Sequence, residues 1–385
     1  MEEKKKVPKL RFPGFTDDWE QHKLSDIVKE VTRTNENSSA PVMMITANDG
    51  FINQSERYST DNAGQSLKKY ILLEKGELAY NHGASKLRPY GSCFALTTEQ
   101  EARIPFVYHC FSTETENPEF LSLVLNGKAV ERQLRKIVSS GARMDGLLNI
   151  SFEEYTSIPI IVPKRDEQDR IADYFRTLGE AITLHQREYD LLKEFKKGCL
   201  QKMFPRNGEA KPELRFPGFT DDWEQRKLSD LTDNIDTGKS KFKSKETGAF
   251  EILGSTSVIG YDDTYDYEGD FLLTARVGAN AGNLYRHAGK VKISDNTVFI
   301  QGSHIDFLYY LLERFDIKKL SFGTGQPLVK ASELRNLSLI VPREDKEKDE
   351  IGRYFKSLDN LITLHQRKLD ELNQFKKGML QKMFV

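Results

Sequence analysis

The chain has 385 residues, of which 38% are hydrophobic, enough for two or three domains with hydrophobic cores of their own. Its formal net charge of −1, with 30% charged residues, excludes a general electrostatic attraction to nucleic acid, so such binding would need local basic patches. The three cysteines are far apart and show no CxxC spacing, which argues against a disulfide framework and a zinc module. We expect a cytoplasmic protein, because we find neither a signal-peptide core near residue 1 nor a run of about 18 apolar residues.

The first predicted element is a lead-in, residues 1–21, that is repeated later in the chain. Residues 10–26 read LRFPGFTDDWEQHKLSD, and residues 214–230 differ from them only in having Arg226 in place of His22. The two copies are 204 residues apart. Each half of the chain therefore begins with the same segment.

Two interiors follow the lead-ins, and we expect each to form one mixed α/β domain, at 22–160 and within 214–340. The first has short β-like runs and then an amphipathic helix, at 41–46, 70–73, 93–98, 104–111 and about 118–138. The second has the same kinds of element at 250–254, 271–278, 296–300 and about 305–315. The interiors do not match each other in sequence, so the two halves share the lead-in and the long helix and differ in the residues between them.

A long helix is predicted at the end of each half, at 161–204 and 341–385. Residues 171–204 and 351–384 are identical at 21 of 34 positions. Each helix follows an Ile-Val-Pro, and acidic residues that favour the positive end of a helix come next, Asp166 and Glu167 or Glu344 and Asp345. Gly198 and Gly378 leave two alternatives open: each helix ends there, or continues through the shared LQKMF.

Apolar residues in each long helix recur at alternating steps of four and three, the pattern of a helix in a coiled coil. The seam consists of Ile171, Phe175, Leu178, Ile182, His185, Tyr189 and Leu192 in the first helix and Ile351, Phe355, Leu358, Ile362, His365, Leu369 and Leu372 in the second. We expect the two helices to pair antiparallel. His185 and His365 either fix the register of that pair or face solvent or a partner at its edge.

Two paired helices of about 38 residues, each roughly 57 Å long at ~1.5 Å per residue, would act as a spacer between the domains. The linker at 205–213 is short, so the first helix ends close to the start of the second domain. If a pseudo-twofold axis relates the halves, Phe384 lies equally close to Leu10. The predicted fold class is α+β: two globular α/β-mixed domains separated by an antiparallel two-helix coiled-coil spacer, in a pseudo-twofold circular arrangement.

The lead-in FPGFTDDWEQ, the junction of Ile-Val-Pro with an acidic helix start, the paired LHQR…FKKGxLQKMF helices and the unlike interiors together resemble a known family. Over essentially the whole chain they are similar to the specificity subunit of a type I restriction-modification enzyme. The resemblance implies that 22–160 and 226–340 are target-recognition domains, each reading one half of a bipartite asymmetric site on double-stranded DNA. It also implies that the repeated helices set the spacing and dock partner subunits.

The same resemblance implies that this chain is not an enzyme. Adenine methylation would come from modification (methyltransferase) subunits, of which two are expected, and cleavage from restriction (motor-nuclease) subunits. S-adenosylmethionine, with ATP and Mg for restriction, is expected on those partners, and no cofactor on this chain. A scaffold in which the coiled coil carries two protein-binding modules is the alternative function.

Base edges and phosphates are contacted by Arg, Lys, Asn, Gln, Ser and Thr on loops, which selects candidate DNA-binding residues. They are Asn81, Ser85, Lys86, Arg88, Ser140 and Arg143 in the first domain and Lys239, Lys241, Lys243, Arg276, Asn280, Asn283, Thr324 and Gln326 in the second. Ordinary polar turns are the alternative interpretation of these segments. Alternation at 239–245 would place four lysines on one side of an extended strand, as a phosphate track or as a solvated loop. Arg132, Arg135 and Lys136 carry the same two interpretations.

Motifs that would give this chain a chemistry of its own are missing. Residues 237–240, TGKS, resemble the end of a phosphate-binding loop, but Asp233 stands where that motif needs glycine. Asn117-Pro118-Glu119 lacks the second proline and the aromatic residue of an adenine methyltransferase motif. His82, His109, Cys93 and Cys110 are of metal-binding types, but such residues in strands are more often satisfied core residues. We therefore expect no catalytic residue and no metal site.

Overall fold

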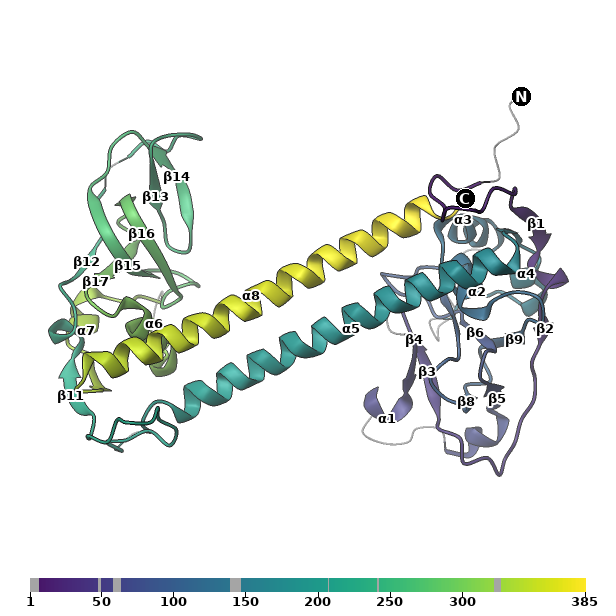
Figure 1. The fold of residues 1–385 in the computed structure, drawn as a ribbon, viewed down its shortest axis with the longest axis horizontal. Coiled ribbons are helices and arrows are strands. Elements are labelled where there is room, and N and C mark those ends of the chain that lie inside the picture. The colour runs from purple at the N-terminus through teal and green to yellow at the C-terminus, as the bar shows by residue number, and fades with distance from the viewer. Residues whose placement is uncertain are drawn as a thin grey trace. The chain divides into compact units, whose positions relative to one another are not determined.

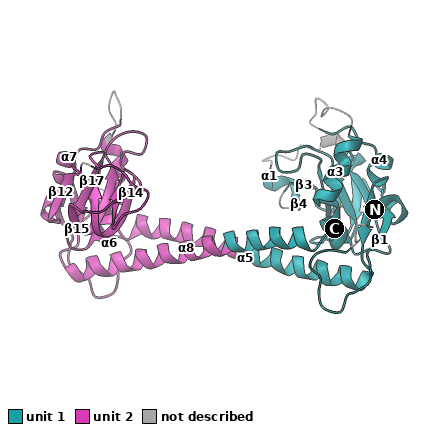
Figure 2. Ribbon diagram, turned by 90° about the horizontal axis from the view of Figure 1, so that it is seen from above, with its two compact units in different colours: residues 1–184, 369–385 teal, residues 185–368 magenta. Residues whose placement is uncertain are grey.

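A computed structural model describes residues 7–47, 50–57, 64–138, 147–206, 208–240, 242–321 and 327–385. The chain divides into two compact units, shown in Figure 2: unit 1 contains residues 1–184 and 369–385, and unit 2 contains residues 185–368. Helices α5 (Arg165–Lys202) and α8 (Asp345–Lys382) each contribute one part to each unit. Within the described part of the chain, no helix combines the length and the hydropathy needed to cross a membrane.

Unit 1 is built on a four-stranded antiparallel sheet with the strand order β2-β9-β6-β7 (Figure 1). Three two-stranded pairs, β1-β10, β3-β4 and β5-β8, complete it. Its strands are β1 (Glu20–Lys23), β2 (Lys29–Glu30), β3 (Met43–Thr46), β4 (Gly50–Asn53), β5 (Ile71–Glu74), β6 (Leu78–Asn81), β7 (Ser92–Ala95), β8 (Glu101–Ile104), β9 (His109–Ser112) and β10 (Pro159–Val162). Its shorter helices are α1 (Gln54–Arg57), α2 (Pro118–Leu125), α3 (Lys128–Ile137) and α4 (Phe152–Thr156).

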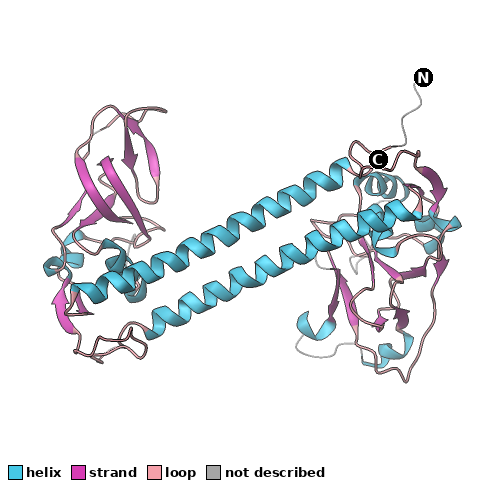
Figure 3. Ribbon diagram, viewed as in Figure 1, coloured by secondary structure: helices cyan, strands magenta, loops and turns pink. Residues whose placement is uncertain are grey.

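Unit 2 is built on a six-stranded sheet with the order β12-β17-β15-β16-β13-β14, in which only β13 and β16 pair in parallel. A separate pair, β11-β18, lies beside it. Its strands are β11 (Glu224–Lys227), β12 (Asn234–Thr237), β13 (Phe250–Leu253), β14 (Val258–Asp262), β15 (Tyr267–Ala275), β16 (Leu284–Ile293), β17 (Thr297–Gln301) and β18 (Ser338–Val341). Its shorter helices are α6 (Ile305–Phe315) and α7 (Ala331–Arg335), so helices and strands mix in both units (Figure 3).

The two interiors, which do not match in sequence, share one strand order. The run β12-β17-β15-β16 in unit 2 repeats the order β2-β9-β6-β7 of unit 1, and every neighbouring pair in both runs is antiparallel. In each unit a strand of the lead-in pairs with the strand that precedes the long helix, β1 with β10 and β11 with β18. The two halves therefore share a strand topology in their interiors, in addition to the repeated lead-in and long helix.

Two details of the predicted elements are wrong. The helix expected at about 118–138 is two helices, because Asn126 and Gly127 interrupt it: the Asn126 amide nitrogen donates to the Ser122 carbonyl and its amide oxygen accepts from the Cys93 backbone. The β-like run at 104–111 is the end of β8 and the start of β9, separated by a turn in which the Tyr108 N–H donates to the Pro105 carbonyl. The helix expected near Ile305–Phe315 is confirmed as α6.

Both long helices continue past Gly198 and Gly378, which settles the alternative left open by the sequence. Their ends enter the cores of the units. Phe204 stacks on Phe307 and Phe355 with ring centroids 6.0 Å apart in each case. Phe384 stacks on Phe120 with ring centroids 5.8 Å apart, meets Trp19 edge-on and is tilted against Phe175.

All fourteen predicted seam residues are buried or half-buried, as expected for the inner side of a helix pair. In unit 2 the helices run antiparallel, since His185 lies beside His365 while Cys199, further along α5, contacts Tyr354, near the start of α8. In unit 1 Phe175 near the start of α5 packs on Phe384 just past the end of α8. The antiparallel pairing is thus confirmed within each unit.

The joints between lead-in and helix confirm the predicted circular connection. In unit 2 the Leu214 N–H donates to the Lys202 carbonyl at 2.8 Å, across the short linker. In unit 1 the Leu10 N–H donates to the Lys382 carbonyl at 2.9 Å, across the two ends of the chain. The same backbone contact joins helix and lead-in in both units, once through a covalent linker and once without one.

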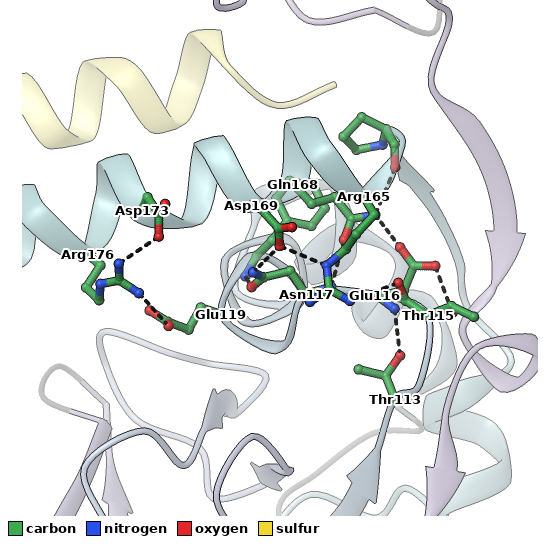
Figure 4. Close-up of polar contacts among 12 residues, drawn as sticks. Thr113, Thr115, Glu116, Asn117, Glu119, Arg165, Gln168, Asp169, Asp173 and Arg176 are labelled. Atoms are coloured by element: carbon green, nitrogen blue, oxygen red, sulfur yellow. Dashed lines mark hydrogen bonds and ion pairs between the residues drawn. The ribbon is translucent and has the colours of Figure 1, made fainter.

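A polar cluster attaches the start of α5 to the interior of unit 1 (Figure 4). Asn117, the N-cap of α2, accepts from the Phe120 N–H at 3.0 Å and donates its amide to Asp169 of α5 at 2.7 Å. Arg165 and Gln168 add further bonds to the same segment. Asn117 therefore has a structural role here.

Unit 2 makes the same joint with different residues. His304, the N-cap residue of α6, bonds Asp349 of α8 at 2.6 Å, and Asp349 is the counterpart of Asp169 at the helix-repeat offset of 180. The aspartate of the repeated helix is therefore present in both units, and its partner differs, being Asn117 in unit 1 and His304 in unit 2.

Candidate nucleic-acid interface

Two hairpin loops occupy the same place in the shared strand order. The first hairpin loop, residues 82–91, joins β6 to β7, and the second hairpin loop, residues 276–283, joins β15 to β16. Half of the fourteen candidates proposed from the sequence lie in or directly beside these loops. Loops that differ in sequence on equivalent strands are suited to binding different ligands with one scaffold.

The described residues that follow the other two predicted turns pair with the same loops. Residues 139–146 and 322–326 lie outside the described residues, and with them Ser140, Arg143, Thr324 and Gln326. Directly after the first of these segments, the Leu148 N–H donates to the His82 carbonyl at 2.9 Å. Directly after the second, the Val329 N–H donates to the Arg276 carbonyl at 2.8 Å. In each unit, therefore, the chain that leaves the second candidate segment pairs with the hairpin loop.

In the first hairpin loop the polar side chains divide into two groups. Asn81 is committed to the backbone, since its amide donates to the Ile45 carbonyl at 3.1 Å and its oxygen accepts from Gly83 at 2.9 Å. Arg88 donates to the Asn126 carbonyl at 2.8 Å, and burial lowers the pKa of its guanidinium. Ser85 accepts from the Arg88 N–H at 3.0 Å and closes the turn. Lys86, at the tip, is exposed.

The second hairpin loop is held by hydrogen bonds within the loop and to the chain after β16. Arg276 donates to the Asp295 carbonyl at 3.3 Å, and the Asn283 amide donates to the Asn280 side-chain oxygen at 3.2 Å. Asn280 is exposed, whereas Asn283 lines a cleft of about 490 Å³ that also includes Tyr309. The loop thus presents amide groups on a fixed backbone, which is the arrangement that base-edge recognition needs.

A glycine with a left-handed backbone stands near the end of each hairpin loop. Gly91 has φ +78°, and a Cβ there would lie 2.4 Å from the Asn81 carbonyl oxygen. Gly282 has φ +86°, and a Cβ there would lie 2.8 Å from the Lys318 Cα. Only glycine fits either position without movement of the backbone.

Helix α3 has a basic face. Val130 and Leu134 are buried on its inner side. The opposite side carries exposed Lys128, Arg132, Arg135 and Lys136. The sequence interpretation included the last three and missed Lys128, although the spacing of 128, 132, 135 and 136 places all four on one helical face.

In the lysine-rich segment the described residues, 239–240 and 242–245, belong to no strand of the sheet, and Lys245 makes an isolated bridge to Tyr261. Strand β12 ends at Thr237, and the Ser240 hydroxyl accepts from the Ile293 N–H at 3.1 Å, which ties the segment to the end of β16. Lys239 bonds Asp236 at 3.0 Å and lowers the pKa of that carboxyl, so the lysine is already paired. Lys243 is exposed, and Lys241 lies outside the described residues.

The histidines and cysteines considered as metal ligands have other partners. Both ring nitrogens of His82 contact carbonyl oxygens, of Leu148 at 2.8 Å and Val107 at 2.6 Å. Burial lowers the pKa of His109, whose Nε2 lies 3.0 Å from the Ile150 carbonyl. Cys93 and Cys110 are buried, and burial raises the pKa of both thiols. These four residues form part of the core of unit 1.

Comparisons with known proteins agree with this architecture. A family model described as the type I restriction modification DNA specificity domain matches residues 220–374. The MjaVIII specificity subunit of a type I restriction enzyme from Methanocaldococcus jannaschii is 24% identical over 278 residues, which are 63% of this chain and 65% of that protein. The EcoprrI specificity subunit from Escherichia coli is 24% identical over 108 residues, 27% of this chain and 27% of that protein. Each match covers less than two thirds of the relative's own length.

A solved structure has a similar fold. The S subunit of a type I restriction-modification system from M. genitalium has a TM-score of 0.65 and 14% sequence identity to this chain, covering 98% of this chain and 99% of that one. The likeness concerns the fold. The resemblance seen in the repeated segments is confirmed by the family model and these relatives: the chain is similar to the specificity subunits of type I restriction-modification systems, and its residues 220–374 match the DNA specificity domain.

Proposed function

We propose that this chain is the DNA-specificity subunit of a type I restriction-modification complex, and that it reads a bipartite asymmetric site. Each unit would contact one half of the site through its hairpin loop and the segment that pairs with it. The observation that carries the proposal is the unlike loops, 82–91 and 276–283, on one repeated strand order. A two-part asymmetric target requires two different recognition surfaces, which two unlike loops on the same strand order would provide.

The contacts of the first hairpin loop suggest which residues of unit 1 shape the loop and which face DNA. Asn81 and Arg88 shape the first hairpin loop through their backbone bonds, which leaves exposed Lys86 at the tip to face the duplex. The basic face of α3 supplies the sequence-independent part of the affinity by binding phosphates. In unit 2 exposed Asn280 offers both a donor and an acceptor, the combination that pairs with adenine in the major groove.

We propose that the long helices fix the separation of the two half-sites and carry the partner subunits. Leu184 and Leu364, and likewise Phe195 and Phe375, are repeat-related, and each is more than half exposed. Exposed apolar side chains at repeated positions suit the docking of two copies of one partner. Those copies would be the two modification subunits, with restriction subunits joining them.

Catalysis is assigned to these partners in the proposal. Methyl transfer to adenine would use S-adenosylmethionine on the modification subunits, and cleavage would use ATP and Mg on the restriction subunits. This chain would bind none of these cofactors and would act by positioning DNA.

The test is sequencing of methylated bases in cells with and without the gene. Loss of one two-part methyladenine motif on deletion, and its return on complementation, is the expected result. An unchanged set of methylated motifs in cells that express the partner methyltransferase would contradict the proposal. If the purified complex then showed no preference for any duplex over random DNA at low salt, the scaffold function would replace it.

A further inference from the structure

Three side chains of metal-binding type converge in unit 2. His185 and Glu188 come from α5, and His365 comes from α8. The Glu188 Oε2 lies 3.2 Å from the His185 Nδ1 and 3.3 Å from the His365 Nδ1. The two Nδ1 atoms are 3.4 Å apart, so the three atoms form a nearly equilateral triangle.

We propose that this triangle is a binding site for a zinc-class divalent ion. Tetrahedral zinc binds imidazole nitrogen and carboxylate oxygen at about 2.0–2.2 Å, which places neighbouring ligand atoms about 3.3–3.5 Å apart. The observed separations of 3.2, 3.3 and 3.4 Å match one face of such a tetrahedron. Two imidazoles and one carboxylate favour zinc over magnesium or calcium, which prefer oxygen ligands.

The cluster has a property that a metal-free contact explains less well. Two ring nitrogens meet at one carboxylate oxygen and also face each other. If both carried a proton to donate to Glu188, two N–H groups would oppose each other at 3.4 Å. A cation at the centre would satisfy all three lone pairs together.

The site is open enough to load. The side chains of His185, Glu188 and His365 are 29%, 43% and 20% exposed. A hydrated ion can therefore reach the ligands, and its fourth position would remain available to water.

The repeat predicts one ion and not two. His185 and His365 are counterparts at the offset of 180, each at position 21 of a 38-residue helix, counted from Arg165 and from Asp345. The counterpart of Glu188 is Lys368, so the frame supplies two imidazoles and a single carboxylate. The ion would join α5 to α8 near the middle of both helices and fix their register. This departs from the absence of a metal site expected from the sequence.

The test is zinc binding by the full chain without an affinity tag, measured by competition with a chromogenic chelator. We expect one ion per chain, and a cobalt(II) derivative with the intense visible absorption of tetrahedral coordination. Glu188→Gln and His365→Gln should each weaken binding roughly 100-fold, since each removes one of three protein ligands. Glu188→Gln keeps the size of the side chain, and circular dichroism would verify that both variants retain their helices.

Matched controls come from other histidines of unit 2 that contact carboxylates. His304 bonds Asp349 through Nδ1 and Asp345 through Nε2, on opposite sides of its ring, so its partners cannot share one ion. His287 contacts a single carboxylate, Glu251. His304→Gln and His287→Gln should leave the affinity for zinc unchanged.

Two outcomes would overturn the site: no zinc bound by the parent chain, or equal affinity in the parent and in folded Glu188→Gln. A rise in melting temperature with zinc that disappears in Glu188→Gln would support it, because an ion that binds only the folded state stabilises that state. None of these measurements involves DNA or a partner subunit, so their result is independent of the proposed function.

Discussion

Arg215 of the second lead-in donates two parallel hydrogen bonds of 2.7 Å to the carboxylate of Glu347, in the first turn of α8. The Glu347 side chain is 1% exposed and also accepts from the Trp223 indole at 3.3 Å. In unit 1 Arg11 grips Glu167 in the same way, at 2.9 and 2.6 Å. In each unit, therefore, the lead-in supplies the arginine and the long helix the glutamate of a buried ion pair.

The first prediction concerns that pair. Arg215→Met should destabilise unit 2 by about 3 kcal/mol, because it leaves the Glu347 carboxylate buried without its charge partner. Unfolding in guanidinium chloride would measure the loss. The control is Arg226→Met, which breaks an exposed pair with Glu224 and should cost less than about 1 kcal/mol. Equal effects of the two substitutions would show that burial of the pair does not matter.

The hairpin-loop glycines give the second prediction. Gly91→Ala should cost at least about 1–3 kcal/mol, because alanine at φ +78° is strained and its Cβ would meet the Asn81 carbonyl. If the loop reads DNA, the variant should also lose affinity for the target half-site read by unit 1. Thermal melting and binding to duplex DNA would check the two effects. A variant with wild-type melting and binding would contradict the proposed loop geometry.

The long helices give the third prediction, in the opposite direction. Gly198 and Gly378 lie inside α5 and α8, and a Cβ at either position would meet no atom within 4 Å. Gly198→Ala and Gly378→Ala should each stabilise the isolated chain by about 0.5–1 kcal/mol, since alanine has the higher helix propensity. If the isolated variants are stabilised and yet assemble poorly with the partner subunits, the glycines serve close approach of a partner.

The fourth prediction separates phosphate binding from base reading. The triple variant Arg132→Gln, Arg135→Gln, Lys136→Gln on α3 should weaken binding to all duplexes to a similar degree. It should also reduce the slope of log affinity against log salt concentration by about one for each phosphate that the variant no longer binds. Fluorescence anisotropy over a range of salt concentrations would measure both.

The control for that variant is Lys75→Gln, because Lys75 lies among Glu74, Glu99 and Glu101 around a cleft that is unfavourable for DNA. It should leave both the affinity and the salt dependence unchanged. A triple variant with wild-type salt dependence would remove α3 from the interface.

The fifth prediction is modularity. Replacing residues 231–336 with the corresponding segment of another specificity subunit should change only one half of the methylated motif, because unit 1 keeps its hairpin loop and frame. Sequencing of methylated bases would show the new motif. A change in both halves would contradict independent reading by the two units.

Much of the fold is predictable from the sequence because it depends on local periodicity and on repetition. The seam residues from Ile171 to Leu192 follow a spacing that fixes one face of a helix, and all are buried or half-buried in the structure. The short linker and the repeat predicted that Leu214 lies near the end of the first helix and Leu10 near the end of the second, and the backbone contacts with Lys202 and Lys382 confirm both joints. The prediction failed where the structure depends on a distant contact, since the break at Asn126 and Gly127 involves a bond to Cys93, which is distant in sequence.

The candidate site was predictable only as loops rich in suitable side chains. Periodicity and composition cannot tell that Asn81 and Arg88 bond the backbone while Lys86 stays exposed, because hydrogen-bond partners such as Ile45 and Asn126 come from other elements.

The sequence by itself determined the repeated lead-in and helix, the antiparallel helix pair and the resemblance to specificity subunits, because those rest on residue identity and spacing along the chain. The tertiary structure alone decided that the unlike interiors share one strand order, since strand pairing is set by contacts between distant segments. It alone brought Glu188 to His365, which come from different helices. Such convergence depends on how helices pack, and side chains far apart in sequence meet only when packing places them together.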